Sequence, residues 1–287
     1  MLRKLSLARR AGSLLRTPAA VSSLLPLSRM QSAVAAGSAT VPADVEVWIN
    51  AAHPAVGLRD RVDARSLVRL SQTLNTSTQS EWMYNEIHGA HPAAHWLFCT
   101  EGGATKDLNA DGYFNTFRPP KPFSVCMWGG GTIHFHDALR VDAHIHSVVR
   151  VSKPQFKAGR TGNMVLVSRT NDIVAKHNNK HLVRDVVNLI YRDENAAKPG
   201  PEAPLSPEQA AVRARPLVQG QDYDFERSVP FETDARTLFR FSALTWNTHR
   251  IHYDSEYAKS EGHDGVLVHG PLQATVLLDF ANEVRLV

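Results

Sequence analysis

The chain has 287 residues, of which 43% are hydrophobic and 21% charged, as in an ordinary globular protein of one large or two small domains. Its formal charge is +4, but residues 1–43 contain six basic side chains and no acidic one, so residues 44–287 carry a formal charge of −2. A slightly acidic body removes the main support for a nucleic-acid partner.

The amino-terminal segment differs in composition from the rest of the chain. Residues 1–32 are rich in Arg, Ser, Leu and Ala and contain no acidic residue, which is typical of a mitochondrial targeting presequence. Arg16 and Pro26 interrupt its apolar runs, and no later segment reaches the roughly 18 apolar residues that a membrane span needs. Cys99 and Cys126 fit reduced thiols. We therefore expect a protein of the mitochondrial matrix with no membrane partner.

The next part of the chain is expected to form a first domain, residues 41–194. Apolar residues at helical spacing predict a helix within residues 41–79. Residues 101–115 are rich in Gly, Asn and Asp, which predicts a surface loop. Alternating apolar residues predict an antiparallel meander of about five strands over residues 122–191, with the glycines 129–131 as one of its turns.

A second domain is expected after a proline-rich stretch. Residues 195–224 contain five prolines and little periodicity, which predicts a linker. Residues 225–244 predict strand-like and loop segments, and residues 271–287 predict a helix with an apolar stripe. No residues remain to form strands over that stripe. We therefore expect either a chain that is shortened relative to the working protein, which we favour, or a stripe covered by another chain.

Two segments near the carboxyl end are the most informative: FSALTWNTHRIHYD at 241–254 and GVLVHGPL at 265–272. Their order of residues predicts a strand end, a polar loop or short helix, a glycine-marked turn and the start of a helix. Such an order can hold an imidazole beside backbone N–H groups that have no partner in the helix. These two groups suit the removal of a proton from the carbon next to a carbonyl, with the N–H groups stabilising the resulting oxyanion.

These segments resemble the hydratase motif of the MaoC-like hot-dog enzymes, in which an acidic residue and a histidine five positions later precede a VHG helix start. The pattern most resembles that of the mitochondrial type 2 3-hydroxyacyl-thioester dehydratases and of their relatives, the mesaconyl-CoA hydratases. The likeness extends upstream through residues 91–96, 117–120 and 127–131. The resemblance implies an α+β double hot-dog fold, in which antiparallel sheet wraps around a long helix. Its first hot-dog, at 41–194, would be degenerate, and the catalytic second one, at 225–287, incomplete.

The same resemblance implies roles for four residues. His252 stands at the place of the hydratase histidine and would abstract the α proton, although an isolated histidine among apolar residues is more often structural. Asn247 stands where the wider pattern has an aspartate; it would orient a hydroxyl or water, or cap a helix that starts at Thr248. Gly270 would donate the oxyanion hydrogen bond from the start of a helix. His269 would support this turn.

Other polar residues of these segments are assigned lesser roles. His249 and Arg250 replace the Asn-Pro of the wider pattern and are expected to be packing or rim residues, with Arg250 either solvated or bound to a carrier phosphate. Asp254 would cap or orient. Ser242 lacks the G-x-S-x-G setting of a hydrolase nucleophile.

A metal site is disfavoured. The pairs His134/His136 and His144/His146 would each lie on one face of a strand, and the connection at 137–142 could bring the pairs together. However, no ligand spacing of the usual zinc kinds is present. The glycine-rich stretches at 129–131 and 159–162 likewise lack the context of a dinucleotide or phosphate loop.

The resemblance implies dehydration of (R)-3-hydroxyacyl thioesters to trans-2-enoyl thioesters in mitochondrial fatty acid synthesis, with no cofactor and no metal. The partner would be an acyl thioester on acyl carrier protein or CoA, and a homodimer is one arrangement that fits. Two alternatives stay open. One is hydration of a small CoA ester such as mesaconyl-CoA. The other is a non-catalytic acyl-thioester-binding hot-dog protein, which the missing aspartate favours; a thioesterase would need a carboxylate that the motif lacks.

Overall fold

A computed structural model describes residues 40–74, 90–114, 116–159, 162–196, 231 and 233–285 of the chain. The predicted presequence at 1–32 and most of the predicted linker therefore lie outside the described residues. The helices are α2 (Ala43–Asn50), α3 (Ala64–Leu74), α5 (Ala235–Thr245), α6 (Ser255–Ser260) and α7 (Gly270–Arg285). Short 3-10 turns are η1 (Pro92–Leu97), η2 (Thr105–Asp107) and η3 (Arg250–His252). The strands are β1 (Val56–Arg61), β2 (Val125–Phe135), β3 (His144–Val151), β4 (Gln155–Gly159), β5 (Gly162–Ala175) and β6 (His181–Arg192).

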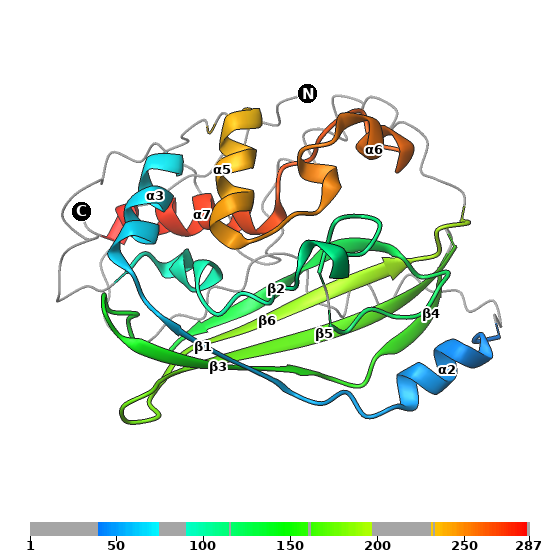
Figure 1. The fold of residues 1–287 in the computed structure, drawn as a ribbon, viewed down its shortest axis with the longest axis horizontal. Helices are drawn as coiled ribbons and strands as arrows, with labels where there is room; N and C mark the ends of the chain where they lie inside the picture. Colours follow the sequence, from blue (N-terminus) through cyan, green and yellow to red (C-terminus); the bar gives the residue numbers. More distant parts are fainter. Residues whose placement is uncertain are drawn as a thin grey trace, which may run out of the picture.

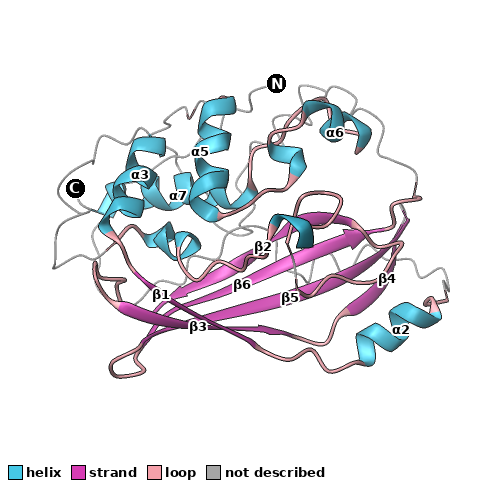
Figure 2. Cartoon of the chain, in the orientation of Figure 1, coloured by secondary structure: helices cyan, strands magenta, loops and turns pink. Residues whose placement is uncertain are grey.

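The strands form one antiparallel sheet in the order β1-β3-β5-β6-β2, with β4 paired to β5. Figures 1 and 2 show this twisted sheet on one side of the molecule and helices α3, α5 and α7 over one of its faces. The sequence therefore predicts the antiparallel strands of residues 122–191 correctly, but not a simple meander. Strands β2 and β3 follow each other in the chain and lie at different positions, with β5 and β6 between them.

The glycines at 129–131 do not form a turn. They lie inside β2, where the register against β6 shifts between Trp128 and Gly131. Gly130 has φ +96, which favours glycine, and a Cβ on Gly131 would lie 2.2 Å from the carbonyl oxygen of Val186. These glycines therefore form a bulge that bends one strand of eleven residues.

The helix expected within residues 41–79 is two shorter helices separated by a strand. Leu67, Leu70 and Leu74 do lie on one buried face of α3. The stretch 56–61 instead pairs with β3, because its backbone completes the edge of the sheet. Tertiary pairing overrides the local helical pattern there.

A second correction concerns residues 225–244, for which strand-like segments were expected. The described part of this stretch contains α5, a helix whose first turn is capped by the Asp234 carboxylate accepting from the Thr237 N–H at 3.0 Å. Leu238 and Phe241, three residues apart, are the buried residues of its inner face.

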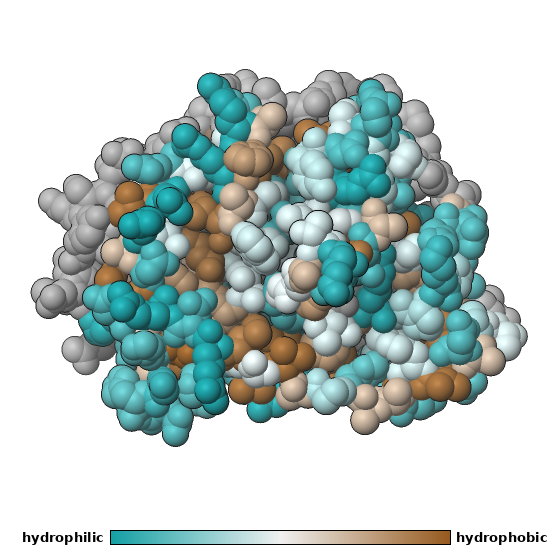
Figure 3. All heavy atoms as spheres, viewed as in Figure 1, coloured by the Kyte–Doolittle hydropathy of each residue, from teal (hydrophilic) through white to brown (hydrophobic). Residues whose placement is uncertain are grey.

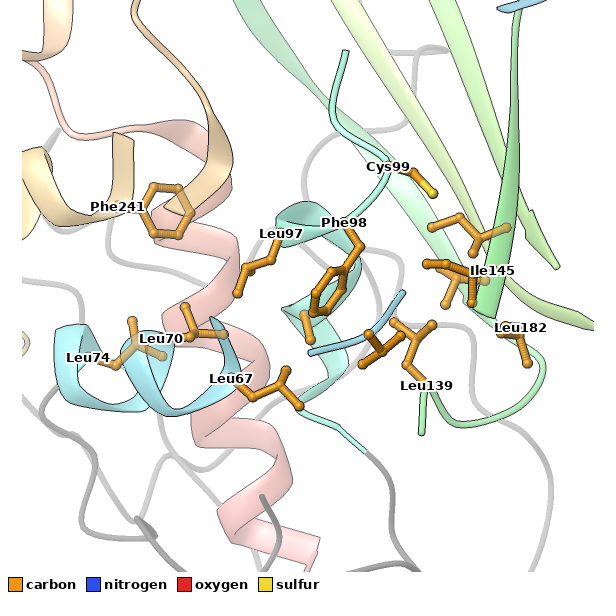
Figure 4. Close-up of a cluster of buried hydrophobic side chains, with 14 of the residues drawn as sticks. Leu67, Leu70, Leu74, Leu97, Phe98, Cys99, Leu139, Ile145, Leu182 and Phe241 are labelled. Atoms are coloured by element: carbon orange, nitrogen blue, oxygen red, sulfur yellow. The ribbon is translucent and has the colours of Figure 1, made fainter. Parts of the chain in front are cut away.

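The main core lies between the helices and the sheet. Figure 4 shows Leu70, Leu74 and Phe241 on one side, Ile145 and Leu182 on the other, and Leu97 and Phe98 between them. Leu272 of α7, fully buried, and Val276 belong to the same core. The expectation that nothing in this chain covers the apolar stripe of the last helix is thus wrong for these two residues.

Two smaller features complete the fold. Val45 of α2 is fully buried in a second hydrophobic cluster with Phe123, Val165 and Tyr191. Figure 3 shows hydrophobic atoms reaching the surface around α3 and α5, and Phe239 of α5 is 70% exposed.

No helix among the described residues combines the length and the hydrophobicity of a membrane crossing.

Candidate active site

His252 occupies a defined and largely buried position at the end of η3. Its Nδ1 lies 2.9 Å from the backbone carbonyl oxygen of Leu267. A carbonyl can only accept, so in the neutral ring Nδ1 carries the proton and Nε2 presents its lone pair. No hydrogen bond to Nε2 is found among the residues that the structure describes. Burial, with a smaller contribution from His249, lowers the pKa of His252 to about 4, so the imidazole is a neutral base near pH 7.

His269 lies face to face with His252. The ring centroids are 3.6 Å apart and the planes differ by 22°. The His269 side chain is fully buried, its Nε2 lies 2.8 Å from Ser242 Oγ, and its Nδ1 has no hydrogen-bond partner among the residues that the structure describes. Burial and the neighbouring histidines lower the pKa of His269 to about 2. His269 is therefore a neutral platform for the His252 ring, anchored by α5 through Ser242.

Asn247 follows the end of α5, where Trp246 adopts a left-handed conformation with φ +54. Its Oδ1 accepts a hydrogen bond from the His249 backbone N–H at 3.0 Å. The predicted helix start at Thr248 is wrong, because the short turn η3 begins two residues later. The amide still binds a backbone N–H, as a capping side chain does, and this bond fixes its orientation.

Gly270 is the first residue of α7, as predicted, and Pro271 follows it. The first N–H groups of a helix have no partner within the helix, and the helix dipole favours negative charge there. A Cβ on Gly270 would lie 2.4 Å from Cε3 of the Trp128 indole. Only glycine therefore fits between α7 and this ring of β2.

A cavity of about 50 Å³ lies between β2, η1 and the face of α7 that follows Gly270. Its lining is mainly apolar and consists of Trp96, Trp128, Gly131, Ile133, Phe135, Asp185, Ala274, Leu277 and Leu278. Neither His252 nor Asn247 belongs to this lining. The connection to the predicted site runs through Trp128, which packs directly on Gly270, and through Ala274, one helical turn further along.

The expected surface loop at 101–115 contains a buried carboxylate that sequence reasoning missed. Asp111 is 4% exposed, accepts from Arg118 Nη1 at 2.8 Å, and lies 3.8 Å from His249 Nε2. Burial lowers the pKa of His249, although Asp111 acts in the opposite direction. Nothing in the Gly/Asn/Asp composition of the loop distinguishes this carboxylate from a solvated one.

Arg250 and Asp254 form a local pair at the edge of the site. Arg250 Nη2 lies 2.7 Å from Asp254 Oδ2, and its guanidinium lies 4.4 Å from the centroid of the Tyr257 ring. Asp254 also caps α6 by accepting from the Tyr257 N–H at 2.9 Å. The capping role predicted for Asp254 is confirmed, and Arg250 is paired within the chain.

The structure does not bring the two His-x-His pairs together. His134 lies on β2 opposite Arg184, whereas His144 and His146 lie on β3, which pairs with β1 and β5. The connection at 137–142 therefore joins strands that are not neighbours. Among the described residues, no three His, Cys, Asp or Glu side chains are grouped as metal ligands.

Comparisons with solved structures identify the fold, and comparisons with sequence families and curated proteins identify the family. The structure is similar to that of a MaoC-like dehydratase from Phytophthora capsici, with a TM-score of 0.55 and 15% identity over 80% of this chain and 74% of that one. A second MaoC-like dehydratase gives a TM-score of 0.50 and 13% identity over 77% of this chain and 74% of that one. The chain thus has the α+β hot-dog fold of MaoC-like proteins, as predicted.

The family model for hydroxyacyl-thioester dehydratase type 2 matches residues 93–286. A mesaconyl-C(4)-CoA hydratase from Chloroflexus aurantiacus is 32% identical over 66% of this chain. The mitochondrial hydroxyacyl-thioester dehydratase type 2 of Schizosaccharomyces pombe is 24% identical over 80% of each chain. The chain spans 63% of the length of the Chloroflexus relative. This chain belongs to the hydroxyacyl-thioester dehydratase type 2 family, a family of hydro-lyases.

Proposed function

We propose that the protein interconverts (R)-3-hydroxyacyl thioesters and trans-2-enoyl thioesters. The observation that supports this most directly is the state of His252. Its Nδ1–H is bound by the Leu267 carbonyl, its ring is held on His269, and its Nε2 has the lone pair that a general base needs. The amino terminus of α7 follows His269 directly in the chain, so the base and the proposed oxyanion donor come from neighbouring structure.

The proposed reaction uses these groups in one dehydration. His252 Nε2 takes the proton from the carbon next to the thioester, and the electron pair of that C–H bond forms the new C=C bond. The Gly270 N–H donates to the thioester oxygen while negative charge accumulates on it. The 3-hydroxyl leaves as water with the proton that His252 received, so the imidazole returns to its neutral form. Hydration follows the reverse path.

Asn247 would place the hydroxyl or the water. Its amide cannot exchange a titrating proton, so both transfers fall to His252. Since its Oδ1 is already bound to the His249 N–H, its amide nitrogen is the group left to donate to the substrate oxygen. The domain division proposed from the sequence, 41–194 and 225–287 around a linker at 195–224, is kept as part of this proposal.

The cavity beside α7 is suited to the acyl chain. It is lined mainly by apolar side chains and begins at Trp128, against Gly270. The Asp185 carboxylate, 4% exposed, also lines it and accepts from Trp96 Nε1 at 2.8 Å. The described lining of the cavity contains no basic side chain that could pair with a carboxylate on the acyl group. This favours a plain acyl chain over the mesaconyl group.

We further propose that the substrate is carried on acyl carrier protein in mitochondrial fatty acid synthesis. The acid-free, Arg- and Ser-rich residues 1–32 and the mitochondrial name of the fission-yeast relative support this location. The second candidate is hydration of mesaconyl-CoA, which the 32% identity to the Chloroflexus hydratase favours. A homodimer stays a prediction.

The test is to follow the loss of the enoyl absorbance when full-length protein is given crotonyl-CoA, an enoyl group on acyl carrier protein, or mesaconyl-CoA. We expect hydration of the first two, with a higher kcat/KM for the carrier-bound substrate. Faster turnover of mesaconyl-CoA would support the second candidate. Tight acyl-thioester binding without turnover of any of the three would favour the non-catalytic alternative.

Gly270→Ala tests the oxyanion role. The added methyl group would collide with Trp128, so we expect the amino terminus of α7 to shift and kcat/KM to fall by about 10- to 100-fold. The matched control is Gly57→Ala in β1, where an added Cβ meets nothing within 4 Å. Gly270→Ala activity equal to that of the control would remove Gly270 from the mechanism.

A further inference from the structure

The loop around Asp111 is bonded directly to the segment that joins Asn247 to His252. The Asp111 carbonyl accepts from the Arg250 N–H at 2.8 Å, and the Gly112 carbonyl accepts from Thr248 Oγ1 at 2.5 Å. A third bond joins Arg250 Nη1 to the Ala110 carbonyl at 3.4 Å. Two segments more than 130 residues apart in the sequence therefore form one structural unit at the proposed site.

The loop is built for this close approach. Gly112 has φ +78, and a Cβ there would lie 2.4 Å from the Thr248 carbonyl oxygen. The loop also braces itself, because the Gly112 N–H donates to the Asn109 carbonyl at 2.8 Å and Asn109 Nδ2 donates to the Tyr113 carbonyl at 2.6 Å. It is therefore a rigid support for the segment at 248–250.

The Asp111 side chain is held from two directions. Its Oδ2 accepts from Arg118 Nη1 at 2.8 Å, and its Oδ1 accepts from the Tyr113 N–H at 3.0 Å. Arg118 in turn donates to the Ser124 carbonyl. The carboxylate fixed in this way lies 3.8 Å from His249 Nε2, a distance at which it attracts and orients the imidazole without a direct hydrogen bond.

His249 contacts both residues proposed to act on the substrate. Its backbone N–H donates to Asn247 Oδ1, and its ring lies nearly perpendicular to that of His252, at 5.8 Å between centroids. The His252 ring is thus bounded by His269 on its face and by His249 on another side. A change in the His249 imidazole would therefore reach His252 through the ring contact, and a change in the His249 backbone would reach Asn247 through the N–H.

We propose that Asp111 and His249 are positioning residues of this active site. Asp111, oriented by Arg118, holds the His249 imidazole, and His249 holds Asn247 and the His252 ring in their working orientation. This proposal rests on the proposed function for the role of His252. The loop at 109–113 precedes strands β2 to β6 in the chain, and residues 247–252 follow them. The proposal gives this distant loop a supporting role in the reaction.

The test uses Asp111→Asn, His249→Asn and the double variant, with kcat and KM measured for enoyl-thioester hydration. Asp111→Asn keeps the shape of the side chain and removes its charge. We expect each single variant to lower kcat by about 10- to 100-fold with KM within about threefold of wild type. If Asp111 acts through His249, the double variant will be no more than about threefold slower than the slower single variant.

The matched control is Asp172→Asn. Asp172 is also a buried carboxylate paired with arginines, Arg150 and Arg184, but it lies on β5. We expect the Asp172→Asn variant to lower the urea midpoint of unfolding as much as Asp111→Asn does. The kcat of Asp172→Asn should stay within about threefold of wild type. The proposal is overturned if Asp172→Asn loses as much kcat as Asp111→Asn, if Asp111→Asn keeps the wild-type kcat, or if the two single effects multiply in the double variant.

A second measurement separates this proposal from the proposed function. The ring nitrogens of His252 can be followed by NMR in ¹⁵N-histidine-labelled protein, whether or not the protein turns over a substrate. We expect Asp111→Asn to shift and broaden the His252 ring signals while those of His91 in η1 are unchanged. Unchanged His252 signals would overturn the positioning role. Absence of wild-type turnover with altered His252 signals would instead count against the proposed function alone.

Discussion

Among the buried histidines of the described residues, two pairs have different surroundings. His252 and His269, in the proposed site, are stacked on each other at 3.6 Å. His91 and His95, at η1, each lie beside a carboxylate. His91 Nε2 is 3.2 Å from Asp279 Oδ1, and His95 Nε2 is 3.5 Å from Asp185 Oδ2.

The difference shows how the surroundings assign a role to the same side chain. His91 Nδ1 accepts from the Ala93 N–H at 2.9 Å, so its Nε2 carries the proton and donates to Asp279 of α7. Both of its nitrogens are used to join η1 to α7. Within the described part of the chain, the His252 ring makes its hydrogen bond through Nδ1 alone, and burial keeps the ring neutral near pH 7. His91 thus links η1 to α7 through hydrogen bonds, whereas His252 has a nitrogen available for chemistry.

The largest expected effect is that of His252→Asn. The asparagine amide can still donate to the Leu267 carbonyl, so the fold is retained while the base is lost. We expect kcat for enoyl-thioester hydration to fall by about 10³- to 10⁴-fold. His91→Asn is the comparison, and its kcat per folded molecule should stay within about threefold of wild type. Equal losses in the two variants would mean that the histidine pairs do not differ in function.

His91→Leu should have the largest effect on stability. It removes the donor to Asp279, whose buried carboxylate is then left without that partner. We expect the free energy of unfolding to fall by about 3 kcal/mol, as when one partner of a buried pair is removed. Urea unfolding followed by circular dichroism measures this. A loss no larger than that of the surface variant His177→Leu would show that the contact contributes little.

Acidification should act on the proposed site through stability. The pKa values of His252 and His269 are lowered to about 4 and about 2 in the folded protein, whereas histidines of an unfolded chain have a pKa near 6.5. Below pH 6.5 the unfolded chain therefore binds more protons, and stability falls as the pH decreases toward the folded pKa. Between pH 7 and pH 5 we expect a loss on the order of 2 kcal/mol for each histidine. Urea unfolding at both pH values measures it, and His252→Asn should lose less than wild type.

Ser242→Ala should give the smallest effect. It removes the hydrogen bond between Ser242 Oγ and His269 Nε2 and leaves a second buried nitrogen of this ring without a partner. We expect a loss of about 1–2 kcal/mol in the free energy of unfolding and a fall in kcat of less than about tenfold. Thr245→Ala, which removes a hydroxyl bonded to the carbonyl of Phe241 in the same helix, is the control. A larger loss of kcat in Ser242→Ala than in His252→Asn would reverse the roles of the two histidines.

The sequence predicted some elements of the fold better than others. The period-two pattern of residues 122–191 predicted strands correctly, since alternation reflects a sheet with one buried face. It did not reveal that 56–61 is a strand, because an edge strand made of VGLRDR has little apolar alternation of its own. It also missed α5, whose buried Leu238 and Phe241 give only a narrow apolar face.

The proposed site divides in the same way. The motif placed His252, Asn247, His269 and Gly270 in one short stretch, and the structure stacks two of them and starts α7 at the last. Asp111 was not predictable, because its contact with His249 spans more than 130 residues and depends on the path of the loop between them. The contact of Trp128 with Gly270 was unpredictable for the same reason.

The sequence by itself determined the family motif, the antiparallel strands, the start of α7 at Gly270 and the proposal of His252 as the base, because each depends on neighbouring residues or on a short pattern. Only the tertiary structure decided the neutral state of His252, its stacking on His269, the contact of Asp111 with His249 and the cavity beside Trp128. Burial and packing between distant segments set the pKa of a side chain and the position of its ring, and neither is a property of local sequence.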